Sequence, residues 1–286
     1  MAYRIVTDTG CDFPTPMYQE LGLAVAPLSV EFRGQTVQYY TDEFLKDMFA
    51  GLRAGEPATT SAVNPQSWQD VIAPALQEGL DALVLTFSSG LSATYQSAVI
   101  AAEELREQYP DRKINVVDTR AASLGQGLFV YYACKKRDTG LSLEDLTAWC
   151  EKTKFNLCHW FTVDDLMYLK RGGRISAATA IAGTLLNIKP VLHADDNGKL
   201  INMSKSRGRK AAIEALAKKM EETGLPGEND TVFICHGDCI EDARYLEKIV
   251  KEKYGVKEVL IGYVGAVIGS HSGPGTLALF FLGEHR

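Results

Sequence analysis

The clearest hydrophobic pattern in the chain is the apolar run Ala82–Thr86. A short continuous run of this kind is typical of a strand buried on both faces. Ser88-Ser89-Gly90 interrupts it, and Ser92 then precedes a stretch at 93–104 with apolar residues at helical spacing. The pattern predicts a strand, a Ser/Gly turn and a helix start, where free N–H groups and hydroxyls suit an anion. Capping of the helix by Ser92 explains the same turn equally well.

Strands and helices alternate through the first half of the chain. The strands are predicted at 3–8, 82–86 and 113–118. Helices are predicted at 41–53, 93–104 and 141–154, and two more are predicted, one that begins near residue 66 and one that ends near residue 137. A hairpin-like excursion covers 23–32 and 35–40, and the polar stretch 59–65 is predicted to be a loop. This alternation favours a mostly parallel sheet covered on both faces, a three-layer arrangement.

The second half has a different pattern, in which strands outnumber helices. Asp195-Asp196-Asn197-Gly198 is a strong hairpin signal. We predict strands at 158–163, 189–194, 199–205, 231–236, 257–263 and 276–282, and helices at 164–170, 177–187, 207–222 and 240–254. The six strands favour a two-layer unit in which helices cover one face of a mixed sheet. We therefore expect two α/β domains, 1–155 and 156–286, packed tightly because no low-complexity linker separates them.

Composition narrows the possible partners. The chain has 286 residues and a net charge of -6, which argues against nucleic acid. No apolar run approaches the roughly 20 residues that span a bilayer. The first residues run directly into a predicted strand, so we expect no signal peptide and a cytoplasmic protein.

Metal and cofactor motifs are weak in this sequence. Cys235 and Cys239 flank His236 and Asp238, but a structural zinc site needs a second close pair of ligands. The six cysteines are predicted to be reduced core thiols. Gly125-Gln126-Gly127 lacks the third glycine of a dinucleotide site and is interpreted as close helix–sheet packing. No phosphate-binding loop or nucleophile elbow occurs, so we predict no metal and no cofactor.

The segment Gly269–Gly275, with sequence GSHSGPG, is predicted to be a glycine-rich loop before the last strand. Its histidine, His271, can bond a carboxylate or move a proton. A surface turn with an incidental histidine is the alternative.

Four motifs together closely resemble the DegV family: Thr60-Ser61, Ser88–Gln96, Arg171–Ile175 and Gly269–Gly275. The opening Thr7-Asp8-Thr9 with Asp12, and Val117-Asp118-Thr119 with Ser123 and Gly125, resemble two further blocks of the family. The chain departs from the pattern at 62–65, where Gln-Pro often follows Thr-Ser, and at Ala93, where glycine is common. Neither departure removes a hydroxyl of the expected site.

The resemblance implies a long-chain fatty acid held between two α/β domains. Such proteins present the acid to a separate ATP-dependent kinase, which makes an acyl phosphate for phospholipid synthesis. The family match assigns the carboxylate to Thr60, Ser61, Ser89, Ser92 and His271. The tail is expected along apolar residues of the second domain, for which we take Ile175, Ile181, Leu185 and Leu186.

Basic residues are candidates for contact with the kinase. Arg171 and Arg174 either fix their loop or face that partner. A second group either docks an acidic kinase surface or is a solvated face: Lys199, Lys205, Arg207, Arg209 and Lys210.

Two other functions remain open at this stage. The family's fold is also similar to the substrate-binding part of dihydroxyacetone kinase, and the Ser/Gly turn would suit a self-sufficient small-molecule kinase. A hydrolase using Ser92 or Ser272 with His271 would need an orienting acid and an oxyanion hole, which the sequence does not identify.

Overall fold

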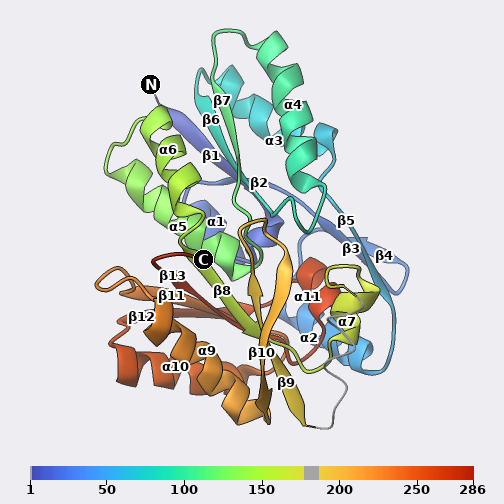
Figure 1. Cartoon of the computed structure of the whole chain (residues 1–286). Coiled ribbons are helices and arrows are strands. Elements are labelled where there is room, and N and C mark those ends of the chain that lie inside the picture. The colour runs from blue at the N-terminus through green and yellow to red at the C-terminus, as the bar shows by residue number, and fades with distance from the viewer. Residues whose placement is uncertain (1, 177–186) are drawn as a thin grey trace.

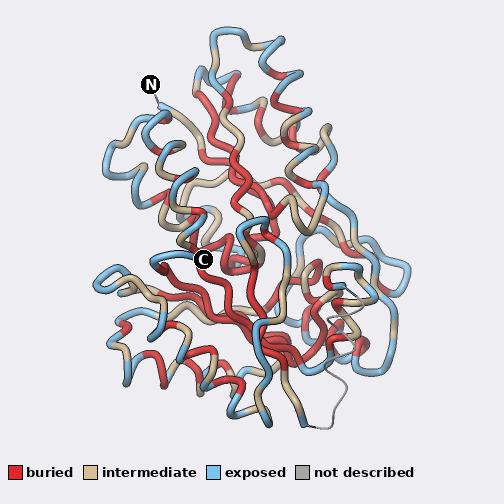
Figure 2. Tube along the Cα trace, viewed as in Figure 1, coloured by how far each residue is buried: buried red, intermediate tan, exposed pale blue. Residues whose placement is uncertain are grey.

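The computed structural model describes residues 2–176 and 187–286. Its first sheet is parallel throughout and has the order β2-β1-β6-β7. These strands are β1 (Tyr3–Asp8), β2 (Ala24–Ala26), β6 (Asp81–Thr86) and β7 (Ile114–Asp118). Helices α3 (Pro65–Gln77) and α4 (Thr94–Gln108) lie on one face, and α5 (Leu124–Asp138) and α6 (Leu143–Thr153) lie on the other (Figure 1). Every residue of β6 is buried, which confirms the strand predicted from the apolar run (Figure 2).

A small antiparallel sheet, with order β4-β3-β5, extends from the first half of the chain. It consists of β3 (Ser29–Phe32), β4 (Gln35–Val37) and β5 (Ala58–Ser61), and α2 (Asp42–Arg53) connects the last two. The hairpin is confirmed for β3 and β4, but residues 24–26 belong to the parallel sheet. The predicted loop at 59–65 is wrong for its first residues, because β5 pairs its backbone with β3. The sequence analysis also missed two short helices, η1 (Thr9–Cys11) and α1 (Thr15–Glu20).

The second sheet is mixed and has the order β10-β9-β8-β13-β11-β12, as predicted for the second half. Among its described strands, β11 and β12 are the one neighbouring pair that runs parallel. The strands are β8 (Leu157–Thr162), β9 (Ile188–Ala194), β10 (Leu200–Arg207), β11 (Thr231–His236), β12 (Glu258–Tyr263) and β13 (Leu277–Leu282). The helices formed by the described residues of this half are α7 (Met167–Arg171), α9 (Arg209–Thr223), α10 (Ile240–Tyr254) and α11 (Ala266–Ser272). The helix predicted at 177–187 lies outside the described residues, apart from Asn187.

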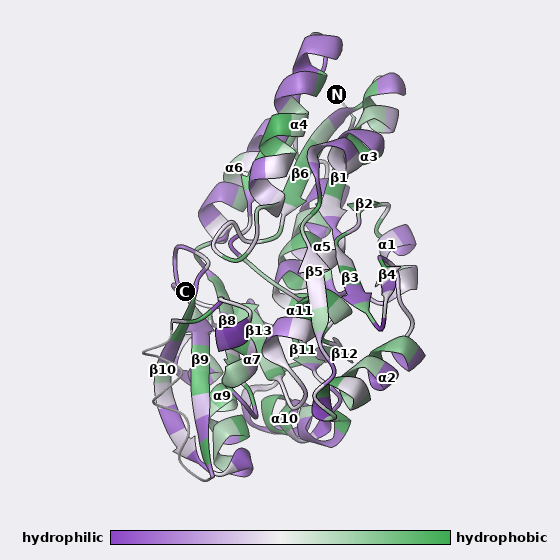
Figure 3. Cartoon of the chain, turned by 90° about the vertical axis from the view of Figure 1, so that its right-hand side faces the viewer, coloured by the Kyte–Doolittle hydropathy of each residue, from purple (hydrophilic) through white to green (hydrophobic). Residues whose placement is uncertain are grey.

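Strand β13 shows how the second sheet is covered on its two faces. Its alternate residues Leu279 and Phe281 join the apolar cluster beneath α9 and α10. Ala278 and Phe280 point the other way, into the large cluster that includes residues of α5. The second sheet therefore packs α9 and α10 on one face, and on the other it packs the first half of the chain together with α7 and α11. Figure 3 shows hydrophobic positions along the strands and hydrophilic positions on the outer faces of the helices.

Helix α5 packs closely because of its glycines: Gly125 faces β8 of the second sheet, and Gly127 faces η1 of the first half. A Cβ on Gly125 would lie 2.3 Å from Nε2 of His159, and one on Gly127 would lie 2.9 Å from the carbonyl oxygen of Cys11. This confirms that the G-x-G sequence serves close packing. The domain limits 1–155 and 156–286 stay a prediction: each large sheet takes its strands from one side of that boundary, yet one apolar cluster crosses it.

The half-buried side chain of Arg286 also joins the two halves. Its guanidinium donates to five backbone carbonyls, those of Thr119, Arg120, Lys154, Leu157 and Asp195. Burial lowers the pKa of this group to about 10. Among the described residues, no helix combines the length and the hydrophobicity needed to cross a bilayer.

Candidate ligand-binding site

A cavity of about 290 Å³, which we call the apolar cavity, lies between the first half of the chain and the second sheet. Most of its lining residues are apolar, and they come from both halves. The first half contributes Leu28, Phe87, Leu91 and Ala122, and the second contributes Phe161, Leu169, Leu200, Val267, Ala278 and Phe280. Such a lining suits an apolar ligand, and a few polar groups in it would orient that ligand.

Thr60 and His271 form one polar part of the cavity wall. Thr60 lies on β5, His271 lies on α11, and Oγ1 of Thr60 is 2.8 Å from Nε2 of His271. The predicted loop at 269–275 is wrong for its first residues, because Gly269–Ser272 belong to α11. Ser61 also lines the cavity. The small third sheet and the last short helix thus bring together two motifs that are 211 residues apart.

His271 is uncharged at neutral pH. Burial lowers the pKa of its imidazole to about 4, and the nearby positive charge of Arg174 adds to the effect. Its ring therefore acts as a hydrogen-bonding group and not as a positive charge. The backbone at Gly172 packs directly against this ring, since a Cβ there would lie 2.3 Å from Nδ1. That contact explains the first glycine of the Arg-Gly-Gly-Arg segment.

Arg174 lines the apolar cavity and fixes its own loop. Its Nε donates to the carbonyl of Leu91 at 3.1 Å, and its Nη1 donates to the carbonyl of Gly172. Burial lowers the pKa of this half-buried guanidinium. Arg174 therefore links the wall around His271 to the Ser/Gly turn, which favours the loop-fixing interpretation. Arg171 is exposed, with its guanidinium 4.6 Å from the ring centre of Tyr168.

Two serines of the Ser/Gly turn point to different places. Ser92 lines the apolar cavity, and its hydroxyl oxygen lies 2.9 Å from Oγ1 of Thr94. The amide of Thr94 also donates to that oxygen, so Ser92 supports the start of α4 as well. The structure does not bring Ser89 to the cavity lining: its hydroxyl donates to Asp118 at 2.5 Å.

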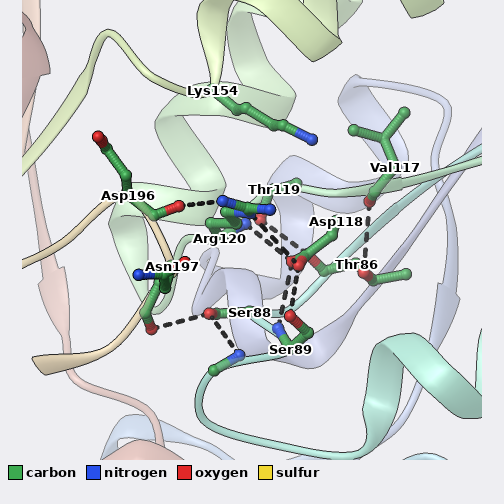
Figure 4. A network of polar contacts seen from close by, with 12 residues as sticks. Thr86, Ser88, Ser89, Val117, Asp118, Thr119, Arg120, Lys154, Asp196 and Asn197 are labelled. Carbon is green, nitrogen blue, oxygen red and sulfur yellow. Dashed lines mark hydrogen bonds and ion pairs between the residues drawn. The ribbon is translucent and has the colours of Figure 1, made fainter. Parts of the chain in front are cut away.

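Figure 4 shows Asp118 between this turn and Arg120, while Ser88 reaches toward the loop that carries Asn197. Ser88 donates to the carbonyl of Gly198 at 2.9 Å. A Cβ on Gly198, whose φ is +69°, would lie only 2.0 Å from the Ser88 hydroxyl oxygen. Ser88 thus links the two halves of the chain, Ser89 is held by Asp118 of its own half, and Ser92 is the serine of this turn that lines the apolar cavity.

The residues expected along the acyl tail are placed differently. Ile175 is buried in the large apolar cluster and does not line the cavity, and Ile181, Leu185 and Leu186 lie outside the described residues. The sequence analysis missed the strand residues that do line it, although their alternation along β8 and β13 was a usable signal. It also did not assign to the carboxylate site Ser272, whose buried Oγ lines the cavity and has no hydrogen-bond partner among the described residues.

The second group of candidate basic residues is divided by the structure. Arg207 is exposed at the end of β10. Arg209, at the start of α9, donates from Nε to Asp242 at 2.8 Å and also lies near Asp164, and its side chain is 20% exposed. Arg209 therefore serves an internal ion pair. Among residues 2–176 and 187–286, no three side chains of the types His, Cys, Asp and Glu meet in a way that could hold a metal.

The two sheets and the apolar cavity define a class of protein: two α/β units, one three-layered and one two-layered, that together line a mostly apolar cavity. A family model described as "Uncharacterised protein, DegV family" matches residues 2–284. The chain belongs to the DegV family, as its motifs predicted.

Individual relatives agree over the full length of the chain. A DegV domain-containing protein of Clostridium perfringens is 45% identical, covering 99% of this chain and 98% of the relative. A DegV family protein of Thermus thermophilus, described by its fatty acid binding, is 34% identical over 99% of this chain and 100% of that one, with a TM-score of 0.88. A Thermotoga maritima protein described as revealing a fatty acid binding function is 30% identical over 99% of each chain, with a TM-score of 0.83.

Proposed function

We propose that this protein binds a long-chain fatty acid in the apolar cavity and presents its carboxylate to a separate ATP-dependent kinase. The observation that carries the proposal is the composition of the cavity wall: a mostly apolar lining with the Thr60–His271 pair and Ser92 in it. Burying each methylene of an acyl tail contributes about 0.8 kcal/mol, so the apolar lining can supply most of the affinity.

The carboxylate would bond Thr60, Ser61, Ser92 and His271. Ser89 is left out of this set, because its hydroxyl already donates to Asp118. The cradle would be made of hydroxyls and a neutral imidazole. Such groups orient a carboxylate without a tight ion pair, so its oxygen stays free to attack a phosphoryl group. Ser272 is a further candidate donor, since its buried hydroxyl lacks a partner among the described residues.

The hydrolase alternative loses its support in this geometry. Nε2 of His271 faces the Thr60 hydroxyl, and no carboxylate among the described residues is hydrogen-bonded to the ring. A serine nucleophile requires a base that a third group holds in place.

Binding is tested by mass spectrometry of an organic extract of the purified, denatured protein. We expect near-stoichiometric fatty acid and no nucleotide. A protein that is empty and takes up no added fatty acid would overturn the proposal and favour the phosphate-binding alternative.

Presentation to a kinase is tested by trapping the acyl phosphate with hydroxylamine, which converts it to a stable hydroxamate. The fatty-acid-loaded protein with ATP alone should give none, and addition of a fatty acid kinase should give product. Reversal of charge at Arg171 and Arg207 should slow product formation and leave fatty acid binding unchanged. Arg209→Glu is a poor probe, because it also breaks the internal ion pair with Asp242. Hydroxamate formed by the protein and ATP alone would instead support the self-sufficient kinase.

A further inference from the structure

A second cavity, of about 650 Å³, lies at another part of the junction between the two halves. We call it the polar cavity. It shares no lining residue with the apolar cavity, and its size is that of a small-molecule site. The first half contributes the segments around η1, α1 and the start of α2, and the second half contributes β12, α10 and the residue before α11. Asp12 from the opening family block and His236 and Asp238 from the Cys235–Cys239 segment line it, but the proposed function gives none of them a role.

Tyrosine rings form much of its wall. Tyr18, Tyr39, Tyr40 and Tyr263 all line the polar cavity. Tyr39 is 63% exposed, which is unusual for a large aromatic side chain. The ring of Tyr263 lies 4.5 Å from that of His236, another lining residue. The faces of tyrosine rings attract cations, and several rings around one space are the arrangement that proteins use for ammonium groups.

Acidic side chains outnumber basic ones in the same lining. The carboxylates are those of Asp12, Asp42, Asp238 and Glu247, and the cations are those of Lys46 and Arg244. Two of the carboxylates already have partners outside the lining: Asp238 pairs with Arg53, and Glu247 pairs with Lys251. Asp42, in the first turn of α2, has no ion pair among the described residues.

Asp12 is the second, independent indication of a ligand. It is nine-tenths buried and lines the cavity, with no cation paired to it among the described residues. Its Oδ2 accepts a hydrogen bond of 2.5 Å from Ser123, whereas its buried Oδ1 accepts no side-chain hydrogen bond within the described residues and lies against the backbone of Gly265. Burial raises the pKa of this carboxyl to about 7. A cation in the cavity would offset the cost of burying that charge.

We propose that the polar cavity binds a small organic ammonium ion, held between the tyrosine faces and the carboxylates of Asp12 and Asp42. A bare metal ion fits less well, because no cluster of three potential metal ligands is formed among the described residues. An anion fits less well too, because the buried charged group of the lining is a carboxylate. The proposal is independent of fatty acid binding.

The experiment compares choline with its neutral isostere 3,3-dimethyl-1-butanol, and n-butylammonium with acetate, by calorimetry on the full chain. Choline or n-butylammonium should bind with a Kd in the millimolar range or tighter. The isostere should bind at least about tenfold more weakly, since it lacks only the charge. Equal binding of the isostere, binding of acetate alone, or binding of neither cation would overturn the proposal.

Two neighbouring residues give a matched pair of variants. Asp42→Asn removes a charge that lines the cavity, and Glu43→Gln removes one from the next residue of the same helix, outside the lining. Asp42→Asn should weaken choline binding roughly tenfold, and Glu43→Gln should change it by less than about twofold. Equal effects would mean that only the overall charge matters. Tyr263→Leu, which keeps every charge, should also weaken binding, and its thermal melt shows whether the variant folds.

Discussion

The two cavities differ in size and chemistry although both lie between the same two halves of the chain. The polar cavity is the larger, at about 650 Å³ against about 290 Å³, but it has carboxylates and tyrosine rings where the apolar cavity has leucine, phenylalanine and alanine. Volume alone would therefore favour the polar cavity for an acyl chain, although its wall is the less apolar of the two. The kind of side chain in the wall decides which ligand class each cavity suits.

One short helix borders both cavities. Gly265, the residue before α11, lines the polar cavity, whereas His271 and Ser272 in its last turn line the apolar one. Residues only a few positions apart in the chain therefore line different cavities. Substitutions that affect one ligand and spare the other would show that the two cavities act as separate sites.

The largest effect is expected from filling the apolar cavity. Ala122 is half-buried and lines it, so Ala122→Phe should place a ring where the acyl chain would lie. We expect a loss of roughly tenfold or more in bound fatty acid, measured by mass spectrometry, and unchanged choline binding. The control is Ala54→Phe, because Ala54 is exposed and lines neither cavity. Full fatty acid occupancy in the Ala122 variant would mean that the acyl chain does not bind in the apolar cavity.

The next effect comes from the polar wall of the apolar cavity. His271→Ala and Thr60→Ala should each weaken fatty acid affinity roughly 10- to 100-fold, because each removes a bond to a buried carboxylate. Ser89→Ala is the matched control, since its hydroxyl bonds Asp118 instead of lining the cavity. A competition assay with a fluorescent fatty acid measures all three. A loss of fatty acid affinity in the Ser89 variant as large as in the other two would mean that Ser89 also binds the carboxylate.

One titratable residue in the wall of each cavity, Asp12 or His271, should make the stability of the protein depend on pH, and the two dependences should have opposite signs. The folded-state pKa of Asp12 is raised by burial from 3.8 to about 7, so its stabilising contribution is complete below pH 3.8 and is lost as the pH rises through 7. The pKa of His271 is lowered by burial from 6.5 to about 4, so its contribution is present above pH 6.5 and is lost as the pH falls through 4.

Urea unfolding of the wild type, Asp12→Asn and His271→Gln between pH 4 and 7.5 measures these contributions. The free energy of unfolding of the wild type relative to Asp12→Asn should fall as the pH rises. Relative to His271→Gln it should increase. The same slope for both comparisons would contradict the different environments of the two groups.

The smallest effect is expected at the rim of the polar cavity. Arg53 pairs with Asp238, and their side chains are 45% and 31% exposed. Arg53→Ala should change the free energy of unfolding by less than about 1 kcal/mol. It also frees the Asp238 carboxylate, so choline binding should strengthen roughly twofold, and fatty acid binding should not change. Weaker choline binding would mean that Asp238 does not face the ligand.

The main strands could be predicted because a strand that is buried on both faces has a short continuous run of apolar residues, which is visible in the local sequence. The strands of the second sheet were found in the same way, and the turn at Asp195–Gly198 marked the boundary between two of them. Strand β5 was missed because its polar residues become a strand only by pairing with β3, which is a non-local contact. Helix α11 was missed because glycine and serine are poor helix formers, and it is held by tertiary packing.

Within the site, the sequence could supply the residue types but not their directions. Thr60 and His271 were found through the family motifs, and the structure brings them together. Ser89 and Ser92 are only three residues apart, and the position of Asp118 on a neighbouring strand decides which of them faces the cavity. For the polar cavity, Asp12 was noticed as part of a family block, but the sequence could not connect it with Tyr40 and Tyr263, which are distant in the chain.

The contacts of Arg286 have a consequence for biosynthesis. The ribosome makes this residue 132 positions after Lys154 and 167 positions after Thr119, two of its carbonyl partners. At a translation rate of about 5–20 residues per second, Arg286 is added roughly 7 to 26 s after Lys154, so the carbonyl of Lys154 lacks this donor during that time. During that interval water must occupy the place of the guanidinium. The first half of the chain can thus form its sheet early, but the part of the seam that Arg286 holds can form only after synthesis has passed residue 286.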